Sequence, residues 1–120
     1  MSIYYTLLTD VGASAMAYAA ANNTPVNLAE VVLGDGGGSA TAPLKTDTQV
    51  VNEVYRASIN SITQHPVNPS WYTIELVIPP HIGGFTIREF TINDANDNAI
   101  FVGNIAAETK PVLPDGMTRD

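Results

Sequence analysis

Apolar residues follow a helical pattern in only one stretch of the chain, close to its start. The alanine-rich residues 11–21 follow Thr9 and Asp10, whose side chains can accept hydrogen bonds from the first N–H groups of a helix. Two asparagines end this stretch ahead of Pro25. Because its side chains are mostly methyl groups, the predicted helix can approach a sheet closely, and we expect it to be docked there.

Most of the remaining chain is predicted to form β-strands. Residues 28–33 are rich in β-branched side chains, and four later runs alternate between apolar and polar positions. These runs are 54–63, 71–78, 85–92 and 99–105. The polar turns between them have the length of hairpin loops. We therefore predict an α+β domain in which the N-terminal Ala-rich helix packs on a mostly antiparallel β-sheet.

The length of 120 residues is that of one domain with one core. We assign the folded domain to residues 1–107. Residues 108–120 show no strand pattern and are predicted to be a linker or the start of a further segment. Residues 34–48 are mainly Gly, Ser, Ala, Thr and Pro, which bury too little apolar surface to offset the entropy of ordering, so we predict an exposed, mobile loop.

Charge and composition narrow the range of partners. The net charge is −7 and the chain contains only five Lys and Arg residues. Nucleic acids and anionic membranes are both bound through clustered basic residues, so neither is an expected partner. A basic or neutral protein surface fits better. The chain has no cysteine, which excludes disulfides, thiolate metal sites and thiol nucleophiles.

A glycine-rich stretch raises the question of a phosphate site. Gly34, Asp35 and Gly36 open this stretch, directly after a predicted strand. The Lys-Ser/Thr pair of a P-loop does not follow them, and no helical pattern begins there. We predict a flexible turn that uses the positive φ angles that glycine adopts easily.

Two further patterns suggest a metal ion without completing a site. Asp94, Asn96 and Asn98 match the first three ligand positions of a calcium loop, but an alanine replaces the required glycine and an isoleucine replaces the bidentate glutamate. A polar hairpin turn explains the same residues. His65 and His81 each lie beside a proline in a predicted loop, without a carboxylate at a metal or triad spacing. We expect no metal and no cofactor.

The glutamates on predicted strands allow a carboxylate pair for hydrolysis, but no feature selects two of them. Glu53 and Glu89 lie close in sequence to Arg56 and Arg88. Partly buried ion pairs across neighbouring strands are the simpler interpretation. We therefore predict that the domain is not an enzyme. A hydrolase using Glu75 and Glu89 stays open as a minor alternative.

Short motifs follow one another in a fixed order along nearly the whole chain. They occupy residues 5–12, 33–36, 51–56, 75–79, 83–89, 94–97, 102–104 and 109–111, and they include Gly83, Gly84, Arg88 and Glu89. Their order and spacing resemble the N-terminal domain of the tail-collar fibre proteins of contractile-tailed phages and tailocins.

The resemblance implies a structural virion protein that attaches a tail fibre to a baseplate protein. It further implies a homotrimer in the full fibre, synthesis in the cytoplasm of the infected bacterium, and a fibre shaft after residue 107. The candidate structural or docking residues are Gly34, Asp35, Gly36, Glu53, Arg56, Gly83, Gly84, Arg88 and Glu89. A carbohydrate-binding module remains the alternative, because the rings of Trp71, Tyr72 and Tyr55 could stack on sugars.

Overall fold

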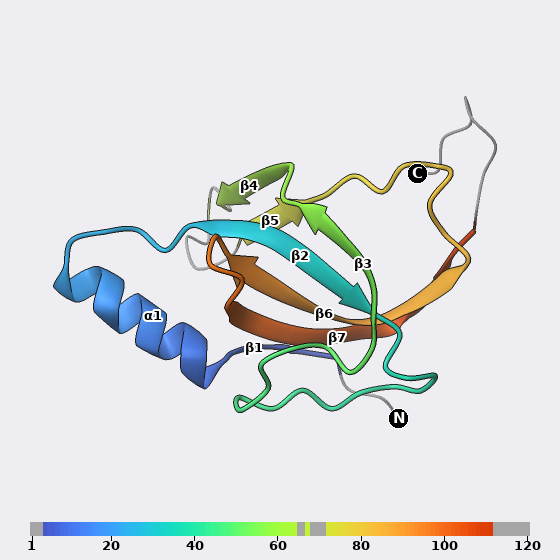
Figure 1. Cartoon of the computed structure of the whole chain (residues 1–120), viewed down its shortest axis with the longest axis horizontal. Coiled ribbons are helices and arrows are strands. Elements are labelled where there is room, and N and C mark those ends of the chain that lie inside the picture. Colours follow the sequence, from blue (N-terminus) through green and yellow to red (C-terminus); the bar gives the residue numbers. More distant parts are fainter. Residues whose placement is uncertain (1–3, 65–66, 68–71, 112–120) are drawn as a thin grey trace.

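The computed structural model describes residues 4–64, 67 and 72–111. Within these residues the chain forms one helix and seven strands (Figure 1). In chain order the elements are β1 Thr6–Leu8, α1 Asp10–Ala21, β2 Leu28–Gly34, β3 Glu53–Ser58, β4 Ser61–Gln64, β5 Tyr72–Glu75, β6 Phe85–Asp94 and β7 Ala99–Lys110.

Five of the strands form one antiparallel sheet in the order β1-β7-β6-β2-β3. β4 and β5 form a separate antiparallel hairpin. The predicted run 54–63 is divided between these two sheets. Ile59 donates its N–H to Ala29 O at 2.9 Å, whereas Asn60 donates to Glu75 O at 2.8 Å. The chain therefore changes pairing partner between two adjacent residues, and the apolar pattern does not mark that change.

The helix begins where the sequence predicts. Thr9 is its N-cap and accepts a hydrogen bond from the Gly12 N–H at 2.8 Å. Thr9 is fully buried, and its hydroxyl also donates to Ala99 O at 2.6 Å. The cap thus joins the first turn of α1 to β7. Asn22 is the C-cap, and Asn23 follows with a φ of 53°.

The predicted α+β class is wrong, because the domain is mostly antiparallel β-sheet with one short helix. α1 lies beside one end of the sheet rather than across its face (Figure 1). Only Gly12 and Ala19 of its 12 residues are buried. A Cβ atom on Gly12 would lie 2.2 Å from Ile100 O, so the helix meets β7 closely at its first turn. Alanine methyl groups cover too little area to hold the rest of the helix on the sheet.

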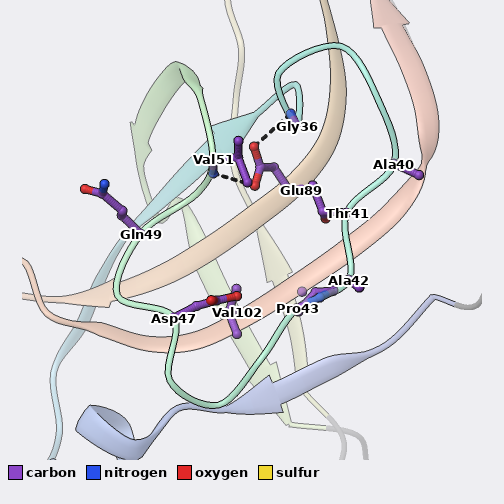
Figure 2. Close-up of a pocket in the computed structure, with 11 residues that line it drawn as sticks. Gly36, Ala40, Thr41, Ala42, Pro43, Asp47, Gln49, Val51, Glu89 and Val102 are labelled. Atoms are coloured by element: carbon purple, nitrogen blue, oxygen red, sulfur yellow. Dashed lines mark hydrogen bonds between the residues drawn. The ribbon is translucent and has the colours of Figure 1, made fainter.

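Both faces of the sheet are covered. Neighbouring side chains on a strand point to opposite faces, and Val31, Val32 and Leu33 are all buried. On one face, Val31 and Leu33 belong to the core cluster, against which the β4–β5 hairpin packs. On the opposite face, residues 35–52 pass over β6 and β7 (Figure 2). The long loop therefore covers part of one face of the sheet.

The sequence pattern missed β1 and the end of β7. β1 has three residues, too few to show a period. β7 continues to Lys110, and Thr109 pairs with Thr86 of β6. The strand therefore passes residue 107, where we place the end of the domain; that boundary stays a prediction. No helix among the described residues is both long enough and apolar enough to span a bilayer.

Candidate functional site

Glu89 of β6 is a buried carboxylate that holds both ends of the loop 35–52. Its side chain lies beneath the loop (Figure 2), and the residue is only 3% exposed. Oε2 accepts hydrogen bonds from the Gly36 N–H at 2.8 Å and the Asn52 N–H at 3.1 Å. Oε1 accepts one from the Val51 N–H at 2.7 Å. A single charged group therefore fixes both ends of the loop, and Val50, at 5% exposed, adds a buried apolar side chain to the same segment.

The glycine-rich stretch is shaped by this carboxylate. Gly34 is the Cα partner of Glu89, and a Cβ atom on Gly34 would lie 2.4 Å from Glu89 Oε2. Gly36 has a φ of 69°, and the two glycines after it also have positive φ. The prediction of a turn with positive φ angles is confirmed. The Gly36 N–H, which a phosphate cradle would use, already donates to Glu89.

The loop has further polar attachments along its length. The Asn104 amide donates to Thr41 O at 2.9 Å, and the Tyr5 hydroxyl donates to Pro43 O at 3.0 Å. A pocket of about 250 Å³ remains beneath the loop, with Glu89 and Val102 among its lining residues (Figure 2). We expected this stretch to be mobile because it is poor in apolar side chains. Most of these residues are exposed, as predicted, and the mobility stays a prediction. Polar groups of distant segments hold the backbone of this stretch.

The predicted pairing of Glu89 with Arg88 does not form. β6 is irregular at this point, because its pairing with β7 shifts between Ile87 and Glu89, and a bulge of this kind re-aims the side chain beside it. Arg88 instead donates from Nη1 to the carbonyl oxygen of Asp35 at 2.9 Å. The pKa of Asp35 is lowered, first by a hydrogen bond from the Asn52 amide and then by the Gly37 N–H. Arg88 and Glu89 therefore act on the same turn from separate positions.

Arg56 does pair with Glu53, but within the single strand β3 and not across neighbouring strands as predicted; its partner on the neighbouring strand is Glu30. Arg56 of β3 contacts Glu53 at 3.1 Å and Glu30 of β2 at 3.2 Å, and it also pairs with Asp97 of the β6–β7 turn. Hydrogen bonds from the guanidinium to Glu53 and then Asp97 raise the pKa of Arg56. The pKa of Asp97 is lowered by the Asn93 amide first and Arg56 second. The cluster joins three segments of the sheet at their surface.

Lys110 at the end of β7 is a second buried charge. It is 7% exposed, and Nζ donates to Ile82 O at 2.7 Å and to Pro111 O at 3.0 Å. Gly84, with a φ of 81°, donates its N–H to Lys110 O at 2.7 Å. A Cβ atom on Gly83 would lie 2.4 Å from Pro111 O. The two glycines thus allow the loop before β6 to lie against the end of β7.

The sequence patterns for metal binding are explained by turn geometry. One oxygen of the Asp94 carboxylate accepts hydrogen bonds from the Asn96 and Asn98 N–H groups at 3.0 and 2.9 Å. This is the polar hairpin turn that we predicted. No group of three or more His, Cys, Asp or Glu side chains that could hold a metal ion lies within the part of the chain that the structure describes. His81 is exposed, and His65 lies outside that part.

Of the residues proposed for sugar binding or hydrolysis, the structure describes the side chains of Tyr55, Glu75 and Glu89. Tyr55 stacks on Phe85, with ring centroids 6.3 Å apart and an interplanar angle of 16°. Trp71 lies outside the described residues, and Tyr72 begins β5. Both oxygens of Glu89 accept backbone hydrogen bonds, whereas Glu75 is exposed on β5. Nothing in this arrangement favours the carbohydrate or the hydrolase alternative.

The whole sequence, residues 1–120, matches the family model of the phage tail-collar fibre protein, N-terminal. The chain belongs to this family. It is 38% identical over 121 residues to a probable tail fiber protein of Escherichia phage P2, and the match covers 99% of this chain and 18% of that relative. No solved structure matches the chain.

The tail-collar fibre domain is thus a structural part of a phage tail fibre, and its relatives place it in the virion tail. The resemblance drawn from the order of the sequence motifs is confirmed. The chain spans about a fifth of the length of the curated relative that it matches. The match therefore does not identify the binding partners of the whole fibre.

One feature of the tail-collar fibre domain was missed by the sequence analysis. A groove of about 1010 Å³ lies between the five-stranded sheet and the β4–β5 hairpin. Its lining includes Phe90 and Phe101 from the sheet, Ile74 from the hairpin and Met16 from α1. The alternation along each strand predicts that its apolar residues share one face. It does not show that the two sheets leave a space between their apolar faces.

Proposed function

We propose that the tail-collar fibre domain attaches its fibre to the phage or tailocin baseplate. The observation that carries the proposal is the match of the entire chain to the N-terminal part of tail-collar fibres. A fibre needs one segment that is held on the tail, and its N-terminal domain is the natural candidate for that segment. A baseplate protein is the partner that this function requires.

The distribution of polar and apolar groups supports an attachment role. The buried charged side chains of Glu89 and Lys110 form hydrogen bonds with the backbone of two loops and hold these loops against the sheet. Met16 and Ile62, which both belong to the described lining of the groove beside the β4–β5 hairpin, are 37% and 42% exposed. Exposed apolar residues that gather on a surface are typical of protein interfaces.

We further propose that the domain acts without catalysis and that the complete fibre is a homotrimer. The family is structural, and Glu89, the buried carboxylate among the residues that the structure describes, already accepts three backbone hydrogen bonds. Light scattering on the isolated chain and on the complete fibre would measure the two masses. A monomeric complete fibre would contradict the trimer.

Attachment can be tested with phage tails that are assembled without their fibres. The purified 120-residue domain should bind these tails and block the later attachment of complete fibres. A fibre from which residues 1–107 are deleted should not attach, although its distal part remains. If complete fibres attach at an unchanged rate in a large excess of the isolated domain, the proposal is wrong.

A further inference from the structure

The groove between the five-stranded sheet and the β4–β5 hairpin has the chemistry of an apolar binding surface. Among the lining residues that the structure describes, all but Thr6 are apolar. Met16 and Ile62 in its lining are 37% and 42% exposed, so the groove opens to solvent. A sugar or nucleotide needs several fixed polar partners, which the described lining does not provide. The surface suits apolar side chains.

The size of the groove calls for several side chains at once. Its volume of about 1010 Å³ is at the upper end of the range for sites that hold whole ligands, roughly 300–1,000 Å³. One inserted side chain would leave most of it empty. Two sheets contribute to it, with Leu33 and Phe90 on one side and Ile74 and Leu76 on the other.

The lining also limits the backbone structure of the occupant. The described lining residues come from the faces of two sheets, from α1 and from the segments beside the strands, so their apolar side chains are what the groove offers to an occupant. An extended peptide in such a groove would bury backbone N–H and C=O groups without partners. An α-helix satisfies these groups internally and presents apolar residues at positions i, i+3, i+4 and i+7. A helix is therefore the occupant that fits.

The charge around the groove selects the flanks of that helix. All of the described lining residues come from residues 1–44, 57–87 and 89–109, stretches in which no Lys or Arg occurs, and the net charge of the chain is −7. Three of the five basic residues, Arg56, Arg88 and Lys110, donate to groups within the domain. A partner whose apolar stripe is flanked by Lys or Arg complements this surface.

We propose that the groove receives an amphipathic, basically flanked helix of the protein to which the fibre is attached. The inference rests on the proposed attachment function, because it names the chemistry of the attachment partner. A second copy of the chain is a poorer occupant. Each copy has most of its few basic groups engaged internally, so a second copy offers no free cluster of Lys or Arg beside an apolar stripe.

Three labelled helical peptides test the specificity by fluorescence anisotropy. The first has a leucine stripe flanked by lysines, the second has the same stripe flanked by glutamates, and the third has the composition of the first in scrambled order. The domain should bind the first peptide at least tenfold more tightly than either of the others. Equal binding of the scrambled or the acidic peptide would overturn the proposal.

Matched variants test the location. Met16→Gln with Ile62→Gln changes the groove lining without changing charge, and Leu44→Gln with Val77→Gln makes the same changes at exposed apolar residues outside it. The groove variant should bind the basic peptide at least tenfold more weakly, whereas the control should match the wild type. Thermal unfolding checks that both variants are folded. Equal binding by the two variants would overturn the assignment.

The same variants separate this inference from the attachment function. If wild-type domain fails to bind fibre-less tails while the peptide results hold, the attachment function fails and the groove's specificity stands. If wild type and groove variant bind tails equally, attachment stands and the groove is not the docking site. A dimer of the chain in sedimentation that dissociates in the groove variant would assign the groove to a second copy and overturn the proposal.

Discussion

Glu89 and Lys110 are buried charges of opposite sign that hold two different loops against the same pair of strands. Glu89 of β6 accepts from three backbone N–H groups of the loop 35–52. Lys110 of β7 donates to two backbone carbonyls, one of them in the loop before β6. In both places glycines bring the backbone close enough to contact the charge. The comparison shows how loops with few apolar side chains are ordered in this domain.

Glu89 and Lys110 differ in how much of the structure each one holds in place. Glu89 lies within the five-stranded sheet, and the loop that it holds covers one face of that sheet. Lys110 lies at the end of β7, where only β6 pairs with it among the described strands. Unpaired buried N–H groups are also rarer in proteins than carbonyls with a free lone pair. Loss of Glu89 should therefore cost more stability than loss of Lys110.

The largest effect is expected for Glu89→Ala. It removes all acceptors of three backbone N–H groups, and we expect the free energy of unfolding to fall by about 4 kcal/mol. Glu89→Gln keeps one carbonyl acceptor and should cost about half as much, roughly 2 kcal/mol. Urea unfolding followed by circular dichroism measures both values. If Glu89→Ala lowers the free energy of unfolding by less than Lys110→Met does, Glu89 is not the more important of the two buried charges.

Gly34→Ala tests whether the close backbone approach depends on the carboxylate. The added Cβ would lie 2.4 Å from Glu89 Oε2, and we expect a loss of about 2 kcal/mol from the displaced side chain. In a Glu89→Ala background the obstacle is absent, so the same substitution should cost much less. A double-mutant cycle measures this coupling. Additive losses would show that Gly34 is needed for another reason.

Lys110→Met keeps most of the side-chain volume and removes the ammonium group. The carbonyls of Ile82 and Pro111 lose their donor, and we expect a loss of about 1.5 kcal/mol in the free energy of unfolding. Limited proteolysis should show cleavage near residues 79–84 and no change within residues 35–52. Cleavage of both loops would show that the two regions are not independent.

The smallest effect is expected for Arg56→Gln, because Arg56 and its partners lie partly in solvent; the loss should be under about 1 kcal/mol. The pKa of Asp97 in the folded domain is below its ordinary value of 3.8. Its contribution to stability is therefore present above that value and is lost as pH falls through the folded pKa.

Arg56 is the second cause of the lowered pKa of Asp97, after Asn93. Arg56→Gln should therefore reduce the fall in melting temperature between pH 5 and pH 3. This range extends about one unit on either side of an ordinary Asp pKa. Lys45→Gln makes the same charge change at an exposed residue and should leave the acid response unchanged. An identical acid response in both variants would exclude Arg56 as a cause.

The sequence predicted the helix, β2, β6 and β7 because each shows a local pattern long enough to recognise. It also predicted the positive φ angles after Gly34 and the Asp94 turn, since both depend on residues within a few positions. The fold class was predicted wrongly from the helix, because periodicity shows an apolar face but not how much area alanines bury. Of the two arginine–glutamate pairs expected, only the one with Arg56 forms.

The sequence by itself determined the positions of most strands, the cap of the helix, the acidic surface and the family, since all of these are encoded in neighbouring residues or in the order of motifs. The tertiary structure decided which backbone groups Glu89 and Lys110 bind and where two sheets leave a groove. Glu89 and Gly36 are 53 residues apart, and their contact depends on the pairing of β2 with β6. Residue spacing along the chain carries no signal for such a contact, because only the folded sheet brings the two groups together.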